Sequence, residues 1–367
     1  MKRSRAAIGT ALVTSTLTSL AMLAVAPAAH AAVSEETLAE GLVGPLQMDI
    51  DEERVVVAES FAGLLTEVTD EGTTVLHSED GFEIAGVAIE DGDVAFLTNK
   101  NPPPPPEEGE EPPAFKPAAF LKVLSDGEAT TVANLRAYEK QVNPDGHVTY
   151  GFKGLSKRCE SKLPEMLQSY KGIVDAHPYG LADAPGGGWY VAEAAGNTIL
   201  KVKPNGKIKT VAVLPRQTVK VTEAIAEEME LPGCLIGEKY GFEAVPTDVE
   251  VAENGSLVVS LLPGGPEDAS LGERGKVVRV NPETGKSKTL AKGLFGATNV
   301  AIGDDGIVYA SELQGSKITA IDGDAVYTYH ETGSPAALEF AYGYLYATIN
   351  VFGDGAALVK LMETTVE

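Results

Sequence analysis

The sequence predicts an all-β fold, a six-bladed β-propeller, and three observations support this prediction. Short apolar segments rich in Val, Tyr and Ile alternate with acidic or glycine turns after residue 35. A unit of three such strands and two turns recurs about six times, as repeat architectures require. The shortest spacings between equivalent positions are 39 residues (Glu59 to Thr98) and 37 residues (Glu312 to Ile349). A spacing near 40 residues is typical of one four-stranded propeller blade.

The first strand of each unit is expected to line the central channel, and the second strand lies outside it. The predicted first strands are 46–50, 86–90, 179–184, 247–251, 298–303 and 337–341. The predicted second strands are 55–60, 94–99, 189–194, 257–262, 307–312 and 345–350. The wider spacings in the middle of the chain predict insertions between the blades there.

The two ends of the chain are predicted to meet. The last unit lacks a fourth strand, and residues 36–42 (ETLAEGL) stand before the first unit without a partner. We expect this segment to complete the last blade with the N-terminal strand, because closure of the ring removes exposed sheet edges. The alternative architecture, a pair of β-sandwiches, would not require the ends to pair.

Residues 1–31 are predicted to be a signal peptide. Lys2, Arg3 and Arg5 precede an apolar run, and Ala29-His30-Ala31 has the small-x-small form of a cleavage site. An uncleaved membrane anchor is the alternative. Residues 32–367 are then a single propeller domain, which we expect to be secreted into the extracellular space.

The composition is strongly acidic. The net charge is −24, and it becomes −27 once the three basic residues of the leader are removed. Such a charge argues against nucleic acid as a partner and against a membrane partner after cleavage, because both need a cationic surface. The alternative interpretation is that the charge only keeps the surface soluble.

Three segments interrupt the repeats. Residues 101–117 form a Pro/Glu-rich loop, read as an extended spacer, with a polyproline docking site as the alternative. The insertions are 134–178 and 216–241, and the second contains a predicted amphipathic helix whose Ile225, Ala226 and Met229 would face the propeller.

The two cysteines, Cys159 and Cys234, lie one in each long insertion. An even count in an oxidising compartment favours a disulfide between them. Insertions from neighbouring blades that are crosslinked in this way are expected to cover one face of the propeller.

The middle and C-terminal parts resemble the ScyD/ScyE family of secreted bacterial proteins. The resemblance spans roughly residues 140–320 and is carried by 173–197, 210–215, 231–234, 242–251, 262–280 and 295–313. It implies a six-bladed propeller related to the NHL and gluconolactonase-like groups. It implies neither an activity nor catalytic residues.

The channel mouth offers candidate ligands for a hard cation such as Ca²⁺, which prefers six or more oxygen atoms. The aligned ring positions are Gln47, Gly86, Gly180, Asp248, Asn299 and Ala337, preceded in their blades by Tyr179, Thr247 and Thr298 among others. Three ring positions carry no polar side chain. Calcium is therefore a possible cofactor, although the ring offers only one carboxylate and two amides as side-chain ligands.

Three glutamates recur at one position of the second strand: Glu59, Glu193 and Glu312. They are candidates to add charge to a metal site. The alternative is that each satisfies backbone N–H groups between blades.

His177, just before the channel mouth of blade 3, is the candidate general base, with Asp175 as its orienting group. The alternative is a loop histidine bonded to backbone. The sequence contains no GxSxG, HExxH, P-loop or GxGxxG motif.

The loop 262–275 is rich in Gly and Pro and carries Arg274, which is expected to form a rim for an acidic ligand. The alternative is a wide turn pinned by Asp268 and Arg274. The favoured function is a binding scaffold for a small molecule, glycan or protein. The alternative function is a metal-dependent lactonase or sugar dehydrogenase-like enzyme that uses the channel mouth.

Overall fold

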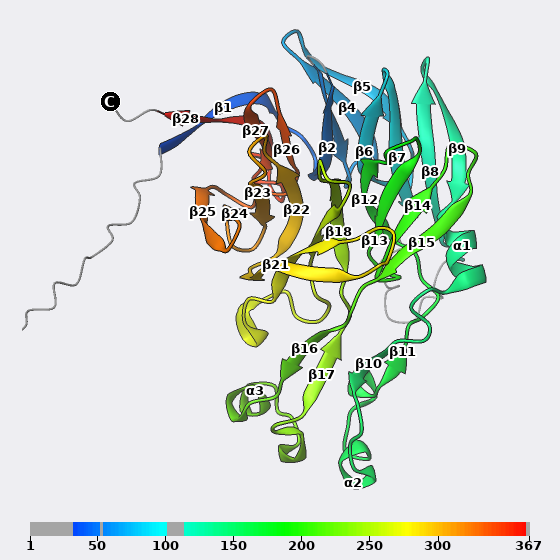
Figure 1. Ribbon diagram of the computed structural model, residues 1–367, viewed down its shortest axis with the longest axis vertical. Helices are drawn as coiled ribbons and strands as arrows, with labels where there is room; N and C mark the ends of the chain where they lie inside the picture. The colour runs from blue at the N-terminus through cyan, green and yellow to red at the C-terminus, as the bar shows by residue number, and fades with distance from the viewer. Residues whose placement is uncertain (1–31, 52–53, 101–113, 365–367) are drawn as a thin grey trace, which may run out of the picture.

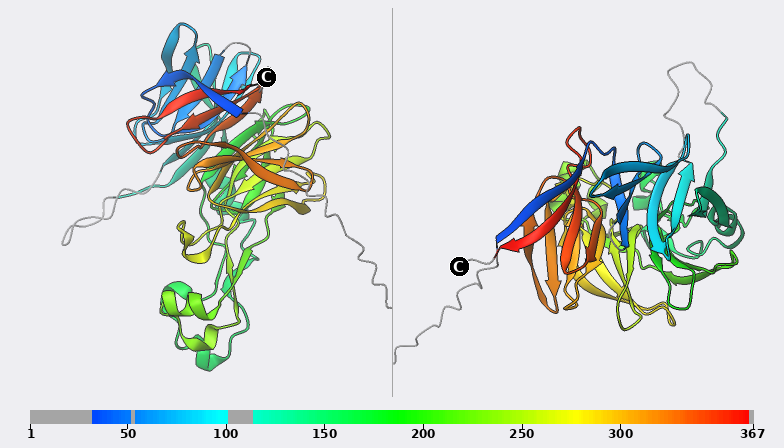
Figure 2. Two further views of the ribbon diagram at one scale, coloured as in Figure 1. Left: turned by 90° about the vertical axis from the view of Figure 1, so that its left-hand side faces the viewer. Right: turned by 90° about the horizontal axis from the view of Figure 1, so that it is seen from above.

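Six four-stranded antiparallel sheets are arranged around a central channel in the computed structural model, which describes residues 32–51, 54–100 and 114–364 (Figures 1 and 2). The predicted signal peptide and most of the Pro/Glu-rich loop lie outside these residues. Each blade is a meander whose first strand is innermost. The prediction of a six-bladed propeller is confirmed.

The strands of blades 1 to 3 follow the chain in order. Blade 1 contains β2 (Pro45–Asp51), β3 (Arg54–Glu59), β4 (Leu64–Thr69) and β5 (Gly72–Ser78). Blade 2 contains β6 (Glu83–Glu90), β7 (Asp93–Lys100), β8 (Ala118–Ser125) and β9 (Glu128–Asn134). Blade 3 contains β12 (Pro178–Asp183), β13 (Trp189–Glu193), β14 (Thr198–Val202) and β15 (Ile208–Val213).

The C-terminal half builds blades 4 to 6. Blade 4 contains β18 (Pro246–Val251), β19 (Leu257–Leu261), β20 (Gly275–Val280) and β21 (Ser287–Leu294). Blade 5 contains β22 (Ala297–Ile302), β23 (Val308–Glu312), β24 (Lys317–Asp322) and β25 (Ala325–Glu331). Blade 6 contains β26 (Leu338–Ala341), β27 (Tyr344–Ile349), β28 (Ala357–Thr364) and β1 (Ala32–Glu40).

The ring closes through its two ends. β1 pairs antiparallel with β28, in a register that runs from Ala32 opposite Thr364 to Glu40 opposite Ala357. The N-terminal strand therefore supplies the outermost strand of the last blade, as predicted from the unpaired segment 36–42. In Figure 2, β1 (blue) and β28 (red) lie side by side.

The core is divided among the gaps between blades. In β3, Val55 and Val57 pack toward blade 6, whereas Val56 and Ala58 pack toward blade 2. Successive side chains of a strand point to opposite faces, so a strand that is covered on both faces needs a continuous apolar run. This explains why the second strands read as unbroken Val, Ala and Leu segments.

The two long insertions form an appendage, a small sheet with strand order β11-β10-β17-β16. Its elements are β10 (Thr149–Phe152), α2 (Lys157–Glu160), η1 (Glu165–Leu167), β11 (Tyr170–Lys171), β16 (Gln217–Lys220), α3 (Glu223–Glu228), η2 (Gly233–Leu235) and β17 (Lys239–Phe242). Helix α1 (Leu135–Val142) precedes it, and η3 (Ala269–Leu271) lies in the blade 4 loop. Figures 1 and 2 show the appendage extending away from the propeller, so the expectation that the insertions cover a face is wrong.

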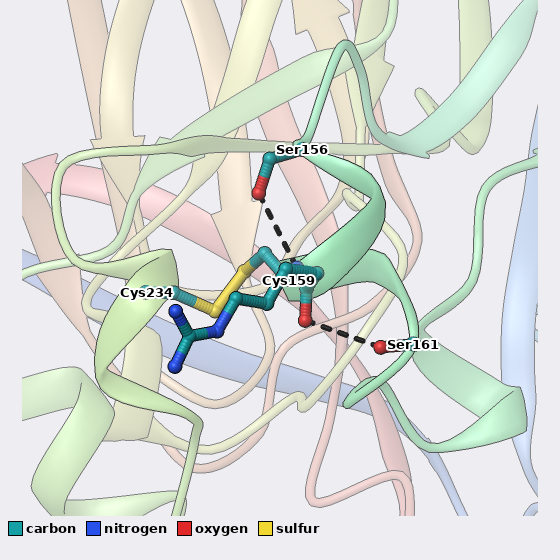
Figure 3. Close-up of a disulfide and its surroundings, with 5 residues drawn as sticks. Ser156, Cys159, Ser161 and Cys234 are labelled. Carbon is teal, nitrogen blue, oxygen red and sulfur yellow. Dashed lines mark hydrogen bonds between the residues drawn. A yellow bond between two sulfur atoms is a disulfide. The ribbon is translucent and has the colours of Figure 1, made fainter.

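The predicted disulfide joins Cys159 to Cys234 across the appendage (Figure 3). Ser156 caps α2 by accepting a hydrogen bond from the Cys159 N–H, 3.3 Å away. The appendage has its own hydrophobic core around the disulfide, and this core contains Phe152, Leu163, Val221, Ala226 and Leu235.

Helix α3 packs on this core and also contacts η3 of the blade 4 loop. Ala226 is buried in the core and Ile225 is packed against it. The expectation that Ala226 and Ile225 face the propeller is therefore wrong, because the second insertion folds against the first one, whereas Met229 lies beside the blade 4 loop.

Candidate functional site

The predicted channel ring exists, and its polar members bind one another. The Asn299 amide nitrogen donates to the Gln47 side-chain oxygen at 3.0 Å, and the Gln47 amide nitrogen donates to the Thr247 carbonyl at 3.2 Å. All three residues are buried. At blade 3 the ring position is Gly180, where an added Cβ would lie 2.6 Å from the Asp248 Cα. The small residue lets blades 3 and 4 approach closely.

The ring also ties blade 4 to blade 5 and blade 5 to blade 6. Asp248 Oδ2 accepts the Val300 N–H at 3.0 Å, and Asn299 Oδ1 accepts the Leu338 N–H at 2.9 Å. Burial raises the pKa of Asp248 to about 7, against the opposing effect of the Val300 and Val249 N–H groups. These two side-chain oxygens therefore already accept hydrogen bonds from backbone N–H groups of the neighbouring blade.

The threonines before the ring are similarly occupied. The Thr247 hydroxyl lies 2.9 Å from the Ser260 hydroxyl, and the Thr298 hydroxyl lies 3.0 Å from that of Ser311. Thr247 also donates to the Ala297 carbonyl at 3.2 Å. The structure brings Gln47, Thr247, Asp248 and Asn299 together as predicted, but as a bonded network.

A second level of the channel was missed by the sequence analysis. Its carboxylates line a cavity of about 180 Å³ together with ring residues: Asp49, Asp183, Glu250 and Glu339. Three of them stand two residues after ring positions (Gln47, Asp248 and Ala337), and side chains two apart share a strand face. The two-residue periodicity of a β-strand, counted from the ring positions, would have predicted Asp49, Glu250 and Glu339.

Burial shapes the charge of this second level. It raises the pKa of Asp49 to about 6 and that of Asp183 to about 7. Burial, followed by the charge of the other carboxylates, also raises the pKa values of Glu250 and Glu339 well above the ordinary range. The cavity lining contains no Lys or Arg. Protons therefore neutralise part of this cluster near neutral pH.

The recurring glutamates bond to the backbone. Glu59 accepts the Val43 N–H at 2.6 Å, and Glu312 accepts the Phe295 N–H at 2.6 Å. Glu193 accepts the N–H groups of His177 and Gly196. This arrangement is the one expected if they satisfy donors between blades. Burial raises the pKa of Glu193 to about 8.

The channel mouth does not fit a hard cation as it stands. The oxygens of Asp248 and Asn299 accept backbone N–H groups, and the repeated glutamates, at the ends of β3, β13 and β23, accept N–H groups of the loops between blades. Among residues 32–51, 54–100 and 114–364, no three His, Cys, Asp or Glu side chains are grouped so as to hold a metal ion.

His177 pairs with a residue that sequence analysis did not select. Its Nε2 lies 2.9 Å from Glu83 Oε2. Burial acts to lower the pKa of His177, but the hydrogen bond and charge of Glu83, with the more distant Glu193 and Asp175, outweigh it and the pKa is raised. The carboxylate that contacts the His177 ring is therefore that of Glu83, from blade 2.

Asp175 does not orient His177 by a hydrogen bond. Its Oδ1 lies 3.2 Å from Arg136 and accepts the Ala176 N–H at 2.9 Å. Tyr179 stands at the mouth with its ring 6.0 Å from that of His177, and burial raises its pKa.

Arg274 is bound within its own loop. Its guanidinium donates to the carbonyls of Gly264 at 2.9 Å and Pro266 at 2.6 Å, and it lies 4.8 Å from the Phe242 ring centroid. Asp268 instead accepts the Ser270 N–H at 2.9 Å. Arg274 thus braces the loop against the appendage.

An apolar groove of about 290 Å³ lies where the appendage meets this loop. Its lining comes from the sheet, from η1 and α3, and from η3 of the blade 4 loop: Phe152, Met166, Leu167, Val219, Val221, Ile225, Met229, Leu231, Tyr240, Phe242, Gly265, Pro266 and Leu271. Met166 is 82% exposed. The groove was not predicted from the sequence, because its walls come from three segments that are far apart in the chain.

Solved structures of similar shape share the fold at low sequence identity. A streptogramin B lyase is 14% identical with a TM-score of 0.52, over 91% of this chain and 98% of that one. A PQQ-bound aldose sugar dehydrogenase from Streptomyces coelicolor is 14% identical with a TM-score of 0.55, over 90% and 98%. A gluconolactonase from Xanthomonas campestris is 13% identical with a TM-score of 0.53, over 91% of both chains.

No family model matches the sequence, and no curated protein does. The resemblance to the ScyD/ScyE family therefore stays a prediction. In the described parts of the chain, no helix is long and apolar enough to cross a membrane. Identities this low establish the architecture and not the chemistry, so the chain is placed as a β-propeller of the general type found in these proteins.

Proposed function

We propose that this chain is an exported binding protein in which the propeller is a rigid support and the appendage groove receives an apolar segment of a partner. The observation that carries the proposal is the groove itself. Its walls are aliphatic, aromatic and methionine side chains, and it opens to solvent beside Met166. Open apolar grooves on soluble domains mark interaction sites.

The groove is held in shape before any partner arrives. The disulfide fixes the two insertions to each other, and Arg274 fixes the loop wall against Phe242. A preformed site loses less conformational entropy on binding, so more of the burial free energy appears as affinity.

Export is part of the proposal. The leader predicted at residues 1–31 lies outside the described residues, and the disulfide is the feature within them that suits an oxidising compartment. We also propose, from the sequence resemblance alone, that the chain belongs to the ScyD/ScyE family.

The test is binding of Nile red, a neutral apolar dye, to the purified chain. We expect saturable fluorescence enhancement that Met166→Gln/Leu271→Gln weakens by about tenfold, equivalent to about 1.4 kcal/mol. Ile236→Gln is the matched control, because Ile236 is 44% exposed on the appendage but does not line the groove. Equal loss in both variants, or no saturable signal, would overturn the proposal.

The second candidate is a metal-dependent lactonase or sugar dehydrogenase-like enzyme. The acid-lined cavity of the channel and the fold shared with a gluconolactonase and a sugar dehydrogenase are in its favour. The committed oxygens of the mouth ring count against it. Calorimetric titration of Ca²⁺ into chelator-treated protein decides: micromolar binding that Asp248→Asn abolishes supports it, and no heat contradicts it.

A further inference from the structure

We infer that the appendage groove takes a cationic amphipathic helix. This inference rests on the proposed function and specifies the partner's chemistry. It follows from the charge around the groove, the direction of the nearby lysines and the surface that forms the groove floor.

The segments that border the groove, here called its rim, carry only acidic charged side chains. Three segments supply its outer wall: η1 (Glu165–Leu167), the α3 segment 223–231 and the loop segment 265–273. Every charged side chain in these segments is a carboxylate: Glu165, Glu223, Glu227, Glu228, Glu230, Glu267, Asp268 and Glu273. All eight residues are exposed. An apolar floor with an acidic border selects an apolar segment bordered by cations.

The basic residues of the appendage sheet point away from the groove. Val219 pairs with Tyr240, and Tyr240 lies between Lys239 and Gly241 in the register of β16 and β17. Because Val219 and Tyr240 line the groove, their neighbours Lys220 and Lys239 lie on the opposite face of the sheet. The lysines therefore do not neutralise the rim.

Arg274, beside the groove, is also withdrawn. Arg274 follows the loop segment directly, but its guanidinium donates hydrogen bonds to the Gly264 and Pro266 carbonyls and stacks over the Phe242 ring. Its charge is directed inward, toward backbone dipoles. The rim thus presents carboxylates to solvent without a basic side chain among its own segments.

The floor favours a helix over an extended strand. Phe152, Val219 and Tyr240 stand opposite one another on one face of the sheet. A partner on this face meets side chains and not the N–H and C=O groups of a sheet edge. It must satisfy its own backbone, which a helix does internally while it presents apolar anchors at i, i+3, i+4 and i+7.

Two methionines suit the groove to such helices. Met166 and Met229 both line the groove, one in η1 and one just after α3. Methionine has several rotatable bonds and a polarisable sulfur, so a methionine-lined groove accommodates side chains of different shape. The charge pattern, more than the exact apolar residues, would then set the specificity.

The probes are three fluorescein-labelled synthetic peptides of equal length. The first is a Leu/Lys amphipathic helix, the second has Glu in place of every Lys, and the third is the Leu/Lys peptide interrupted by two prolines. Anisotropy titrations use the full mature chain. We expect the Leu/Lys peptide to bind at least about tenfold more tightly than either other peptide. We also expect its affinity to fall several-fold as the salt concentration rises toward about 0.5 M.

A charge-matched pair of variants locates the effect. Glu165→Lys/Glu227→Lys reverses one carboxylate in η1 and one in α3 and should weaken the Leu/Lys peptide by about tenfold or more. Glu283→Lys/Asp324→Lys makes the same change in net charge at exposed turns of blades 4 and 5 and should leave the affinity within about twofold. Circular dichroism confirms that both variants are folded.

The outcomes separate the two proposals. If all three peptides bind equally, or if both charge variants weaken binding alike, the cationic helix is wrong while the apolar groove stands. If no peptide binds and Nile red binding is unaffected by the Met166→Gln/Leu271→Gln variant, the groove itself is not a binding site.

Discussion

Asn197 and Asp145 share a buried hydrogen bond of 3.0 Å that ties blade 3 to the base of the appendage. Asp145 also accepts the Tyr150 hydroxyl at 2.9 Å, and Asn197 accepts the N–H groups of Ala244 at 2.7 Å and Val245 at 3.0 Å. One asparagine of blade 3 is therefore bonded both to the first insertion and to the segment that follows the second.

Asn197→Ala is expected to lower the free energy of unfolding by about 3 kcal/mol, because several buried groups lose their partners at once. Asn197 also has a positive φ of 56°, which alanine tolerates less well. Asn350→Ala is the control, since Asn350 has a φ of 54° but is exposed. Urea denaturation that shows equal loss in both variants would assign the effect to the backbone alone.

Gly180→Ala tests the close packing of the channel. The new Cβ would lie 2.6 Å from Asp248 Cα and 3.0 Å from the Thr247 carbonyl oxygen, and backbone atoms cannot rotate away. We expect a loss of about 2 kcal/mol or more from the strain of overpacking. At Gly355 an added Cβ meets nothing within 4 Å, so Gly355→Ala should lie within about 0.5 kcal/mol of the parent.

Sequence reasoning reached the propeller because its signals are local and repeated. The Val55–Ala58 run encodes a strand covered on both faces, and the unpaired segment near Glu36 required a partner at the other end. Cys159 and Cys234 were the only two thiols, so their pairing followed from compartment and count.

The site was harder because its geometry depends on residues far apart in the chain. The partner of His177 is Glu83, from the neighbouring blade, whereas the adjacent Asp175 turns to Arg136. The groove joins Met166, Met229 and Leu271 from three segments. No spacing in one sequence encodes such contacts, because the first depends on how blades 2 and 3 pack and the second on how the two insertions fold against each other.

Cys159→Ser/Cys234→Ser should destabilise the appendage in particular. A crosslink that spans 75 residues constrains the unfolded chain by up to about 4 kcal/mol in the loop-entropy model. We expect limited proteolysis to cut first within the appendage of the variant, while the propeller fragments resist. Cleavage rates equal to those of the parent would show that the appendage core holds without the disulfide.

The stability of the chain should fall as the pH rises from about 4 to about 8. Burial raises the pKa of Asp49 to about 6 and those of Asp183 and Asp248 to about 7, all from 3.8. A carboxyl whose pKa is raised by folding binds its proton more tightly in the folded state. Its contribution is thus fully present below the unfolded pKa and is lost as the pH rises through the folded value.

The measurement is Tm in chelator-containing buffer across this pH range. Glu250→Gln/Glu339→Gln replaces two channel carboxyls by groups that never ionise, so we expect a higher Tm at pH 8 and a flatter profile, because fewer carboxyls then repel one another as the pH rises. Glu283→Gln/Asp324→Asn removes two exposed charges and should keep the parent profile. A parent Tm that rises between pH 5 and pH 8 would contradict the electrostatics of the channel, since it would require these carboxylates to be stabilised in their ionised form.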